Sequence, residues 1–535
     1  MNKQLTMKRR SFLTTTCATA SVLAVSSARG KKAKPLMKNG KPMNIVVMMV
    51  DEWRYDQFGY RGERMIKTPN IDKLAESGNS FDNTYCVSPI CTPSRGSLWT
   101  GQYTMKHGCN FVTMDKHMPP DQWSYIDTLK KSGYVIGLSG KNHIFNDEFM
   151  DKYFDFREEY THFGKNHGTM TKADQAVYDY RHDEKRPEFK SDTPDQGSVL
   201  FEGLIEGPLP FKKEECMTHR IAEDGIRFLR DHADDDKPFM LHYSFPDPHW
   251  PNVVPEPYYS MYDPSKIEFE GMDIDWATHP AAHYIQSTAN GFGDYTMAER
   301  QRIAATMYGQ MTFIDDSVGL FMDELKRLGL DENTIVVFTA DHGNFGGHYG
   351  MIGKTKAFYD SLVRIPLIVQ FPGIENGREF SANIENVDIM PTVMEYLGAP
   401  AQKGIHGKSF LEILRQGHGT HRNEIFAEIG LNQAPPPVMP LKELDAYAKM
   451  RKAKDGNSWF LDYTVKGRSS MLIKDDWKYC HYVGDREELY NLKDDPLELR
   501  NHAALGGHET KLAEMRAALL DKILKASMEP DAWSA

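Results

Sequence analysis

The 535-residue sequence lacks the features of several protein classes. Its six cysteines include no CxxC pair, which excludes a disulfide-stapled fold and a structural zinc site built on such pairs. Positive charge is not in excess, since 64 lysines and arginines stand against 75 aspartates and glutamates, a net charge of −11. We therefore predict no nucleic-acid partner. No stretch after the N-terminus reaches 18 uninterrupted apolar residues, so we also predict no membrane span.

The N-terminus has the layout of an export signal. Arg9 and Arg10 precede Ser11, and a weakly apolar run rich in Thr and Ser follows. This order is typical of a signal peptide, and the paired arginines resemble a twin-arginine signal. A disordered basic tail is the alternative. We predict that residues 1–28 are a signal peptide and that the protein is periplasmic or secreted, in a bacterium.

Four apolar runs of strand length each end in ionisable residues. They are 45–50 before Asp51 and Glu52, 134–139 before Lys141 and His143, 239–244 before Asp247 and His249, and 334–340 before Asp341 and His342. Such runs are typical of strands buried on both faces of a parallel sheet. Ligands bind at the carboxyl ends of such strands, so we expect these side chains to converge. The alternative is that each polar group only caps its own strand.

Helical patterns fill the intervals between these runs, as an α/β fold requires. Apolar spacing predicts a short helix over residues 71–77 and a long amphipathic helix over residues 305–328. Residues 157–200 and 250–300 show no clear periodicity, and we interpret them as loops over the site that determine specificity.

The pattern changes after Gly407. Shorter alternating runs appear there, followed by a helix with Leu512, Met515 and Leu519 on one stripe. The length allows one large core and a smaller one. We predict a large α/β domain over residues 40–410 and a smaller α+β domain over residues 411–535.

Cys91 differs from the other cysteines because it lies in a Pro/Ser/Arg turn at the start of an apparent helix, close to Arg95. A thiol near a helix N-terminus and an arginine is stabilised as the nucleophilic thiolate. The alternative for Cys91 is a small buried hydrophobic residue. We interpret the neighbouring Cys86 as structural.

The run from Cys91 to Arg95 (CTPSR), followed by Gly101, resembles the signature of type I sulfatases, alkaline-phosphatase-like hydrolases in which this cysteine is oxidised to Cα-formylglycine. Further segments are similar to the family's motifs: Asp51-Glu52, Thr68 to Asp72, Gly140 to His143, Pro248 to Pro251, Asp341 to Gly343, Gly353-Lys354 with Tyr359-Asp360, and Leu489 to Leu492. The resemblance implies a large, mostly parallel mixed sheet between helices, with a smaller C-terminal α+β domain. Residues 40–410 would then form the catalytic domain.

The same resemblance implies cofactors. A divalent metal, calcium or alternatively magnesium, would be held by a set of five residues: Asp51, Glu52, Cys91, Asp341 and His342. Carboxylate oxygens are hard ligands that suit both ions. The formylglycine at position 91 implies a formylglycine-generating maturation enzyme as a partner.

Catalytic roles follow for the remaining motif residues. Arg95, Lys141 and Lys354 would hold the sulfate group. His143 would deprotonate a hydroxyl of the hydrated aldehyde so that sulfate departs. His249 would protonate the departing alcohol, with Lys354 assisting.

We therefore predict a sulfatase that acts on a sulfated saccharide or an aryl sulfate. Export, long polar loops and Trp250 beside His249 favour carbohydrate. Two alternatives remain, namely a phosphonate monoester or phosphodiester hydrolase of the same fold and a non-catalytic binder of sulfated glycans. Lys356 competes with Lys354 for its role, and the spacing to Tyr359 favours Lys354.

Overall fold

The computed structural model describes residues 41–110, 122–182, 206–288, 295–435 and 466–528, with positions 37–38, 118–119, 443 and 446. The predicted signal peptide lies outside these residues. None of the helices in the described part of the chain combines the length and the apolar character needed to span a bilayer.

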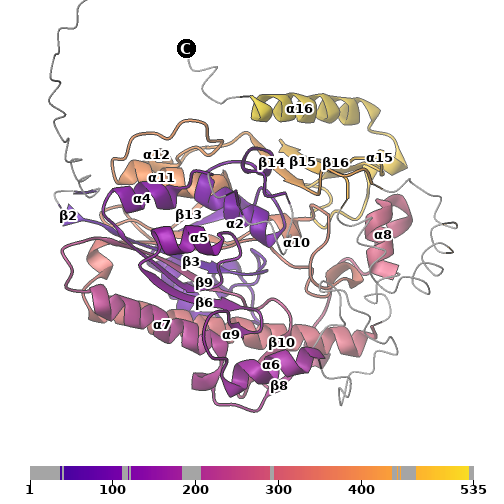
Figure 1. Cartoon of the computed structure of the whole chain (residues 1–535). Coiled ribbons are helices and arrows are strands. Elements are labelled where there is room, and N and C mark those ends of the chain that lie inside the picture. Colours follow the sequence, from indigo (N-terminus) through magenta and orange to yellow (C-terminus); the bar gives the residue numbers. More distant parts are fainter. Residues whose placement is uncertain are drawn as a thin grey trace, which may run out of the picture.

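A nine-stranded sheet forms the centre of the larger part of the molecule (Figure 1). Its order is β13 (Arg378–Glu385), β4 (Asn79–Tyr85), β12 (Leu367–Gln370), β11 (Thr334–Ala340), β3 (Asn44–Val50), β9 (Phe239–Phe245), β5 (Val135–Gly140), β6 (Phe156–Thr161) and β7 (Gly164–Lys165). Strand β12 is antiparallel to both of its neighbours and β7 is antiparallel to β6, whereas the other pairs are parallel.

The four strands predicted from apolar runs, β11, β3, β9 and β5, are direct neighbours in this sheet and mutually parallel. Successive side chains of a strand point to opposite faces. In β3, Val46 and Met48 accordingly pack into one core cluster, and Val47 and Met49 pack into the other. Because both faces need cover, the strand lies between two helical layers.

Helices provide that cover on each face of the sheet (Figure 1). On one side lie α1 (Pro69–Glu76), α7 (Met217–His232) and α9 (Met297–Arg327), and on the other α2 (Cys91–Thr100), α4 (Tyr125–Lys131), α5 (Asp147–Tyr153), α11 (Ile389–Tyr396) and α12 (Leu411–Gln416). Other elements are α3 (Thr104–His107), α6 (Lys172–His182), α8 (Ala281–Thr288), α10 (Asp360–Val363), β8 (Glu206–Leu209) and β10 (Asn252–Pro255).

The loop interpretation of residues 157–200 and 250–300 is wrong in part, because β6, β7, α6, β10 and α8 lie within these stretches. The long helix α9 also begins at Met297 rather than at residue 305. Its start is a capping box, in which the Thr296 hydroxyl and the Glu299 carboxylate bond each other's backbone N–H. This polar signal precedes the apolar periodicity used to predict the helix.

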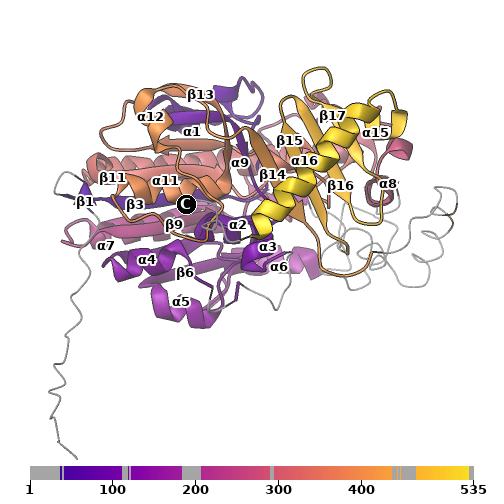
Figure 2. The ribbon, with the colours of Figure 1, turned by 90° about the horizontal axis from the view of Figure 1, so that it is seen from above.

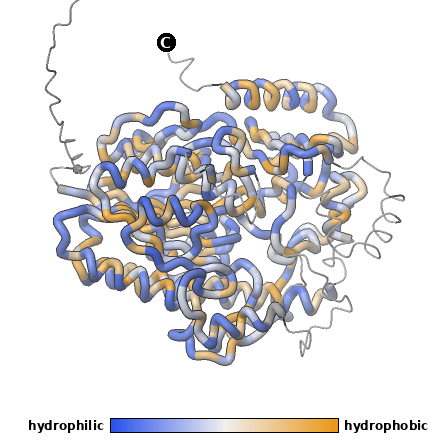
Figure 3. The backbone as a smooth tube through the Cα atoms, in the orientation of Figure 1, coloured by the Kyte–Doolittle hydropathy of each residue, from blue (hydrophilic) through white to orange (hydrophobic). Residues whose placement is uncertain are grey.

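A second, antiparallel sheet follows in the order β14 (Glu424–Ile429), β15 (Ser469–Lys474), β16 (Trp477–Tyr482) and β17 (Glu488–Asn491). Helix α16 (Glu509–Ser527) crosses it (Figure 2), and hydrophobic and hydrophilic residues alternate around this helix (Figure 3). Its Met515 and Leu519 pack with Phe426 and Leu472 of the sheet. The α15 turn (His502–Leu505) precedes it.

The two sheets together confirm the predicted fold class, a large mostly parallel mixed sheet between helices with a smaller α+β part. Helix α12 begins at Leu411, yet its apolar side chains belong to a core cluster of the large sheet. The domain division at residues 410 and 411 stays a prediction.

Candidate active site

The residues that follow β3, β5, β9 and β11 meet in one buried cluster around Cys91. Cys91 is the first residue of α2, and its Sγ lies 3.5 Å from Asp51 Oδ1 and 3.2 Å from His342 Nε2. Lys354 Nζ donates to the same Sγ at 3.1 Å. The parallel strands thus deliver their C-terminal residues to the N-terminus of one helix, as the strand pattern predicts.

The backbone is forced into unusual conformations to form this cluster. Gly140, at the end of β5, has φ of 115°, and a Cβ at this position would lie 1.7 Å from the carbonyl oxygen of Ser244. Only glycine permits that approach, which lets Lys141 N donate to Ser244 O at 2.8 Å. Glu52 and His143 have φ of 54° and 56° without being glycine, so the site holds backbone strain.

The thiol of Cys91 is placed among cations. Burial and the Asp51 carboxylate both raise its pKa. The surrounding cations, led by Lys141 and Lys354 and joined by His342, outweigh them in total, so the pKa of Cys91 is lowered from its usual value. The side chain is 1% exposed. The cluster therefore stabilises negative charge at this position.

Arg95 and Lys141 join Lys354 around the same point. Arg95 donates from Nε to Asp341 Oδ2 at 2.7 Å and from Nη1 to Ser244 Oγ at 2.9 Å. Its buried Nη2 has no hydrogen-bond partner among the described residues and lies 3.9 Å from the nearest Asp51 oxygen. Lys141 pairs with Asp51. One guanidinium nitrogen is thus left over for an acceptor that a bound anion would supply.

Two histidines of the site differ in how their ring nitrogens are paired. His249 Nδ1 hydrogen-bonds the carbonyl oxygen of Trp250 at 2.7 Å, so Nε2 faces Glu52 Oε1 at 3.2 Å. Burial lowers the pKa of His249, against the opposing effect of Glu52. Burial and Lys141 hold the pKa of His143 well below its usual value. The buried Nδ1 of His143 has no hydrogen-bond partner in the described part of the chain.

A candidate metal centre lies within the cluster. Ligand atoms of Asp51, Cys91, Asp341 and His342 all lie within 4.8 Å of one another, and all four residues are buried. His342 Nδ1 donates to Gly343 O at 2.8 Å, which leaves Nε2 facing the group. Two carboxylates and an oriented imidazole suit a divalent cation.

The pKa of His342 is raised to about 9, which favours its protonated form. Burial lowers this pKa, but the Asp341 carboxylate and Cys91 together outweigh burial. A ligating imidazole is neutral, so a cation would displace this proton. The residues therefore fit the metal that the family resemblance implies.

Glu52 lies in a second group with Cys91 and His249, which shares Cys91 with the first group but contains neither Asp341 nor His342. Its carboxylate pairs with Lys354 and accepts a hydrogen bond from Asn344 Nδ2 at 2.6 Å. The structure therefore places Glu52 between the candidate acid and the candidate lysine.

Sequence reasoning missed two members of the site. Asn344 Nδ2 donates to Glu52, and the signal that could have found it is its place directly after the motif Asp341 to Gly343. His162 Nε2 lies 3.1 Å from Lys141 Nζ, and its ring stacks on His249 with centroids 3.7 Å apart. It sits in a polar stretch without a motif, so no sequence signal marks it.

Lys356 is placed elsewhere. Its Nζ donates to the carbonyl oxygen of Lys466 at 2.7 Å, toward the C-terminal sheet. Cys86 is also buried, and its Sγ donates to Leu362 O at 3.8 Å. Of the two competing lysines, Lys354 is the one beside Cys91.

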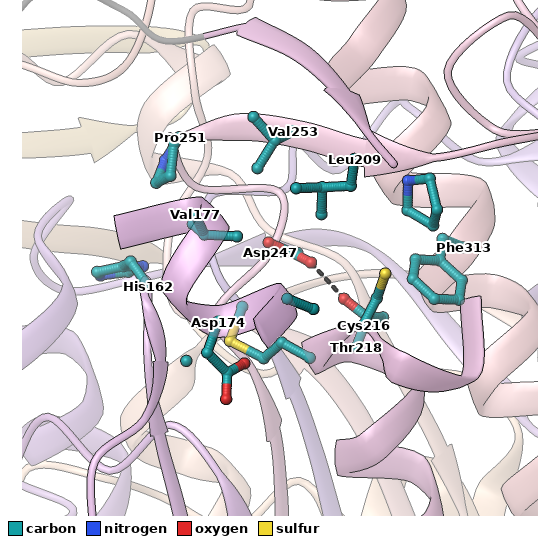
Figure 4. A pocket seen from close by; sticks show the side chains of 14 residues that line it. His162, Asp174, Val177, Leu209, Cys216, Thr218, Asp247, Pro251, Val253 and Phe313 are labelled. Carbon is teal, nitrogen blue, oxygen red and sulfur yellow. Dashed lines mark hydrogen bonds between the residues drawn. The ribbon is translucent and has the colours of Figure 1, made fainter. Parts of the chain in front are cut away.

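A pocket adjoins the cluster at His162 (Figure 4). It contains about 410 Å³ of empty space, part of which is open to solvent. Apolar side chains such as Val253 and Phe313 line much of it, around the carboxyl group of Asp247. Thr218 and Gln310 donate to that carboxyl, and burial raises the pKa of Asp247 to about 7. The segment before His249 is therefore held by buried hydrogen bonds.

Comparison with known proteins places this arrangement in context. A model of the sulfatase family matches residues 43–399. The chain is 28% identical over 391 residues to an ulvan-active sulfatase of Formosa agariphila, covering 72% of this chain and 68% of that protein. It is 26% identical over 493 residues to an arylsulfatase of Clostridium perfringens, covering 90% and 94%. A phosphonate monoester hydrolase from Silicibacter pomeroyi shares the fold, with a TM-score of 0.70 and 23% identity over 91% of this chain and 96% of the other.

Proposed function

Since this chain belongs to the sulfatase family and is a sulfuric ester hydrolase, we propose that it removes sulfate from a sulfated carbohydrate through a nucleophile made from Cys91. The observation that carries the proposal is the position of Cys91, at a helix N-terminus with Lys354 Nζ at 3.1 Å and in one cluster with Arg95, whose Nη2 has no hydrogen-bond partner among the described residues. A maturation enzyme would oxidise position 91 to formylglycine, and water then adds to the aldehyde. One hydroxyl of the hydrated aldehyde attacks sulfur, and loss of the proton from the other hydroxyl later releases sulfate and reforms the aldehyde.

The metal in this proposal is calcium, with magnesium as the alternative. Asp51, Asp341 and His342 would hold it, together with position 91. When bound, the cation stabilises the charge that develops on the nucleophile and on the sulfuryl oxygens. Glu52, the fifth predicted ligand, contacts Lys354 and His249.

Arg95, Lys141 and Lys354 bind the sulfate group. All three are buried or nearly so, and low-dielectric surroundings strengthen their interaction with an anion. Arg95 Nη2, whose neighbouring nitrogens are fixed by Asp341 and Ser244, is oriented to donate to a sulfate oxygen. Preorganised donors of the protein thus take the place of the water molecules that surround the sulfate group in solution.

Two histidines move protons at opposite ends of the ester. The low pKa of His143 keeps its ring neutral near pH 7, so Nδ1 accepts the proton from the hydroxyl whose loss releases sulfate. His249 donates from Nε2 to the oxygen of the departing alcohol, and its lowered pKa makes its imidazolium a stronger acid. In the absence of substrate, the Glu52 carboxylate pairs with the same Nε2.

Carbohydrate is favoured by the ring beside the acid. Trp250 is half-buried, its ring centroid lies 5.5 Å from that of His249, and it packs edge-on against Phe163 at 6.3 Å. A fixed, partly exposed indole suits the apolar face of a sugar. The names of the relatives, an ulvan-active sulfatase and an arylsulfatase, include both predicted substrate classes.

The test uses enzyme coexpressed with a formylglycine-generating system. Sulfate release from defined sulfated saccharides is measured beside hydrolysis of a matched pair, nitrophenyl sulfate and a nitrophenyl phosphonate monoester, with Cys91→Ala as control. We expect a higher kcat/KM for the sulfate than for the phosphonate, and turnover of at least one saccharide. A preference for the phosphonate would establish the alternative hydrolase, and tight binding of sulfated glycans without turnover would establish the non-catalytic binder.

A further inference from the structure

The segment that carries Lys354 is held by buried charges of the C-terminal sheet. Lys478, on β16, is fully buried, and its Nζ donates to Phe358 O at 2.9 Å and to Asp360 Oδ1 at 2.6 Å. The same Nζ lies 2.7 Å from Glu498 Oε1. Glu498 Oε2 in turn accepts the backbone N–H of Asp360 at 2.6 Å. Both the backbone and a side chain of the segment are thus bound.

Other contacts to the same segment come from the C-terminal part and from helix α8. Lys356 donates to Lys466 O at 2.7 Å, and its own carbonyl oxygen lies 3.1 Å from His283 Nε2. The hydroxyl groups of Tyr359 and Tyr490 are 3.4 Å apart. The C-terminal part therefore binds positions 356 and 359 through Lys466 and Tyr490, and His283 of helix α8 contacts position 356 as well.

The other end of the segment is in the site. Lys354 Nζ contacts Glu52 and Cys91, and only three residues separate Lys354 from Phe358. Burying an ammonium and two carboxylates is costly and is weak evidence for a gain in stability. What the buried contacts do provide is one fixed position for the segment.

We infer that Lys478 and Glu498 are positioning residues for Lys354, through which the C-terminal sheet sets the geometry of the active site. This inference rests on the proposed function, because Lys354 acts there on the sulfate and the leaving group. Lys478 fixes Phe358 and Asp360, and the short connection holds the ammonium of Lys354 beside position 91. Without that support Lys354 has alternative positions, and a misplacement of about 1 Å costs roughly 100-fold in rate.

The experiment is a double-mutant cycle between this support and Lys354. The variant Lys478→Met/Glu498→Gln removes the buried cation and one carboxylate together, which limits unfolding, and it is combined with Lys354→Ala. We expect a loss of about 100-fold in kcat/KM for nitrophenyl sulfate in the wild-type background. In the Lys354→Ala background we expect no more than about twofold further loss, because the positioned group is already absent.

A matched control removes another ion pair of the same sheet. Glu428→Gln/Arg468→Met breaks a buried carboxylate's pairing, and neither residue contacts positions 354–360 in the described structure. Its effect on kcat/KM should be small and equal in both backgrounds. Conversely, equal 100-fold losses for Lys478→Met/Glu498→Gln with and without Lys354 would show a purely structural role and overturn the inference.

A second readout does not need turnover. Calorimetric titration with inorganic sulfate should show weaker binding for Lys478→Met/Glu498→Gln only when Lys354 is present, while circular dichroism checks that each variant is folded. Independent effects on sulfate affinity would overturn the positioning role. Failure of the proposed function gives a different result. The wild-type enzyme would then bind inorganic sulfate, and its affinity would still depend on Lys478 and Glu498 through Lys354, but it would release no sulfate from any ester.

Discussion

Two buried clusters of opposite charges in this molecule are built differently. In the first, Arg422 donates from Nε to Asp388 Oδ2 at 2.6 Å, and Nη1 lies 3.0 Å from Glu385 Oε2. Its Nη2 pairs with Asp388 and also donates to His406 O at 3.0 Å. Every nitrogen of this guanidinium has a partner, and Arg422 holds the pKa of Asp388 below its usual range despite burial.

The second cluster, around Cys91, has left-over groups. Arg95 Nη2 and His143 Nδ1 have no hydrogen-bond partner among the described residues, and Glu52 and His143 have strained backbones. Burial of charge is therefore common to both clusters, whereas unused donors and strain occur in the candidate site. Between these two clusters, incomplete pairing around one point distinguishes the candidate site, whereas perturbed pKa values do not, since ion-pair networks of structural origin also perturb pKa values.

The largest expected effect is at position 91. Cys91→Ala should lower kcat/KM for an aryl sulfate by about 10⁶-fold, as loss of a nucleophile does, with the thermal midpoint little changed. Peptide mass analysis of the active wild-type enzyme should show Cys91 converted to the aldehyde. The matched control is Cys86→Ala, which removes a buried thiol outside the cluster and should cost stability but not activity. Full activity with an unmodified Cys91 would refute the proposed nucleophile.

One substitution in each cluster tests whether the first serves stability and the second serves catalysis. Asp341→Asn should lower kcat/KM by about 10²- to 10³-fold or more and abolish the stabilisation that calcium confers on the wild type. Asp388→Asn should instead cost about 3–5 kcal/mol of stability, because it leaves Arg422 buried and unpaired, with kcat/KM of the folded enzyme unchanged.

Kinetics and calorimetry with and without a chelator measure both effects. Elemental analysis confirms that the metal has been removed. Full activity after exhaustive chelation, or a larger catalytic loss for Asp388→Asn than for Asp341→Asn, would contradict the distinction between the clusters.

The sheet could be predicted from sequence because its central strands are buried on both faces. Apolar runs such as residues 45–50 and 334–340 have no other place in an α/β fold. The convergence of Asp51 and Asp341 then follows from parallel pairing of the strands. The catalytic roles of the histidines and lysines were predicted from the resemblance of their motifs to those of sulfatases. The expectation that side chains converge at the ends of parallel strands agrees with these positions but does not assign the roles.

What could not be predicted depends on tertiary contacts. His162 reaches Lys141 and His249 only because β6 joins the edge of the sheet beside β5. Lys478 is one lysine in an alternating strand, and nothing local marks it as buried. Helix α9 was predicted too short because a capping box, and not the apolar stripe, marks its start. The positions of these residues depend on partners far away in the chain, and the order of amino acids in one sequence does not show which partners meet.

A smaller effect distinguishes the proton donor from the anion-binding residues. His249→Ala should lower kcat/KM for a sugar sulfate by about 10²- to 10⁴-fold, yet change that for nitrophenyl sulfate little, because nitrophenolate departs without a proton. Lys141→Ala should lower both by similar factors, since the sulfate charge is the same in both substrates. Equal losses on the two substrates for His249→Ala would assign the proton to another group, with Lys354 next in line.

The smallest effect concerns pH and the fully paired cluster. The pKa of Asp388 is depressed in the folded protein relative to about 3.9 in the unfolded chain, so its contribution to stability is present above that pH and is lost as pH falls toward the folded value. Asp388→Asn lacks this contribution at every pH. The difference in unfolding free energy between wild type and Asp388→Asn should therefore narrow, by about 1 kcal/mol between pH 7 and pH 3. Urea unfolding of both proteins across this range measures it. A gap that stays constant or widens toward low pH would show that Arg422 does not hold the Asp388 carboxylate in its ionised form.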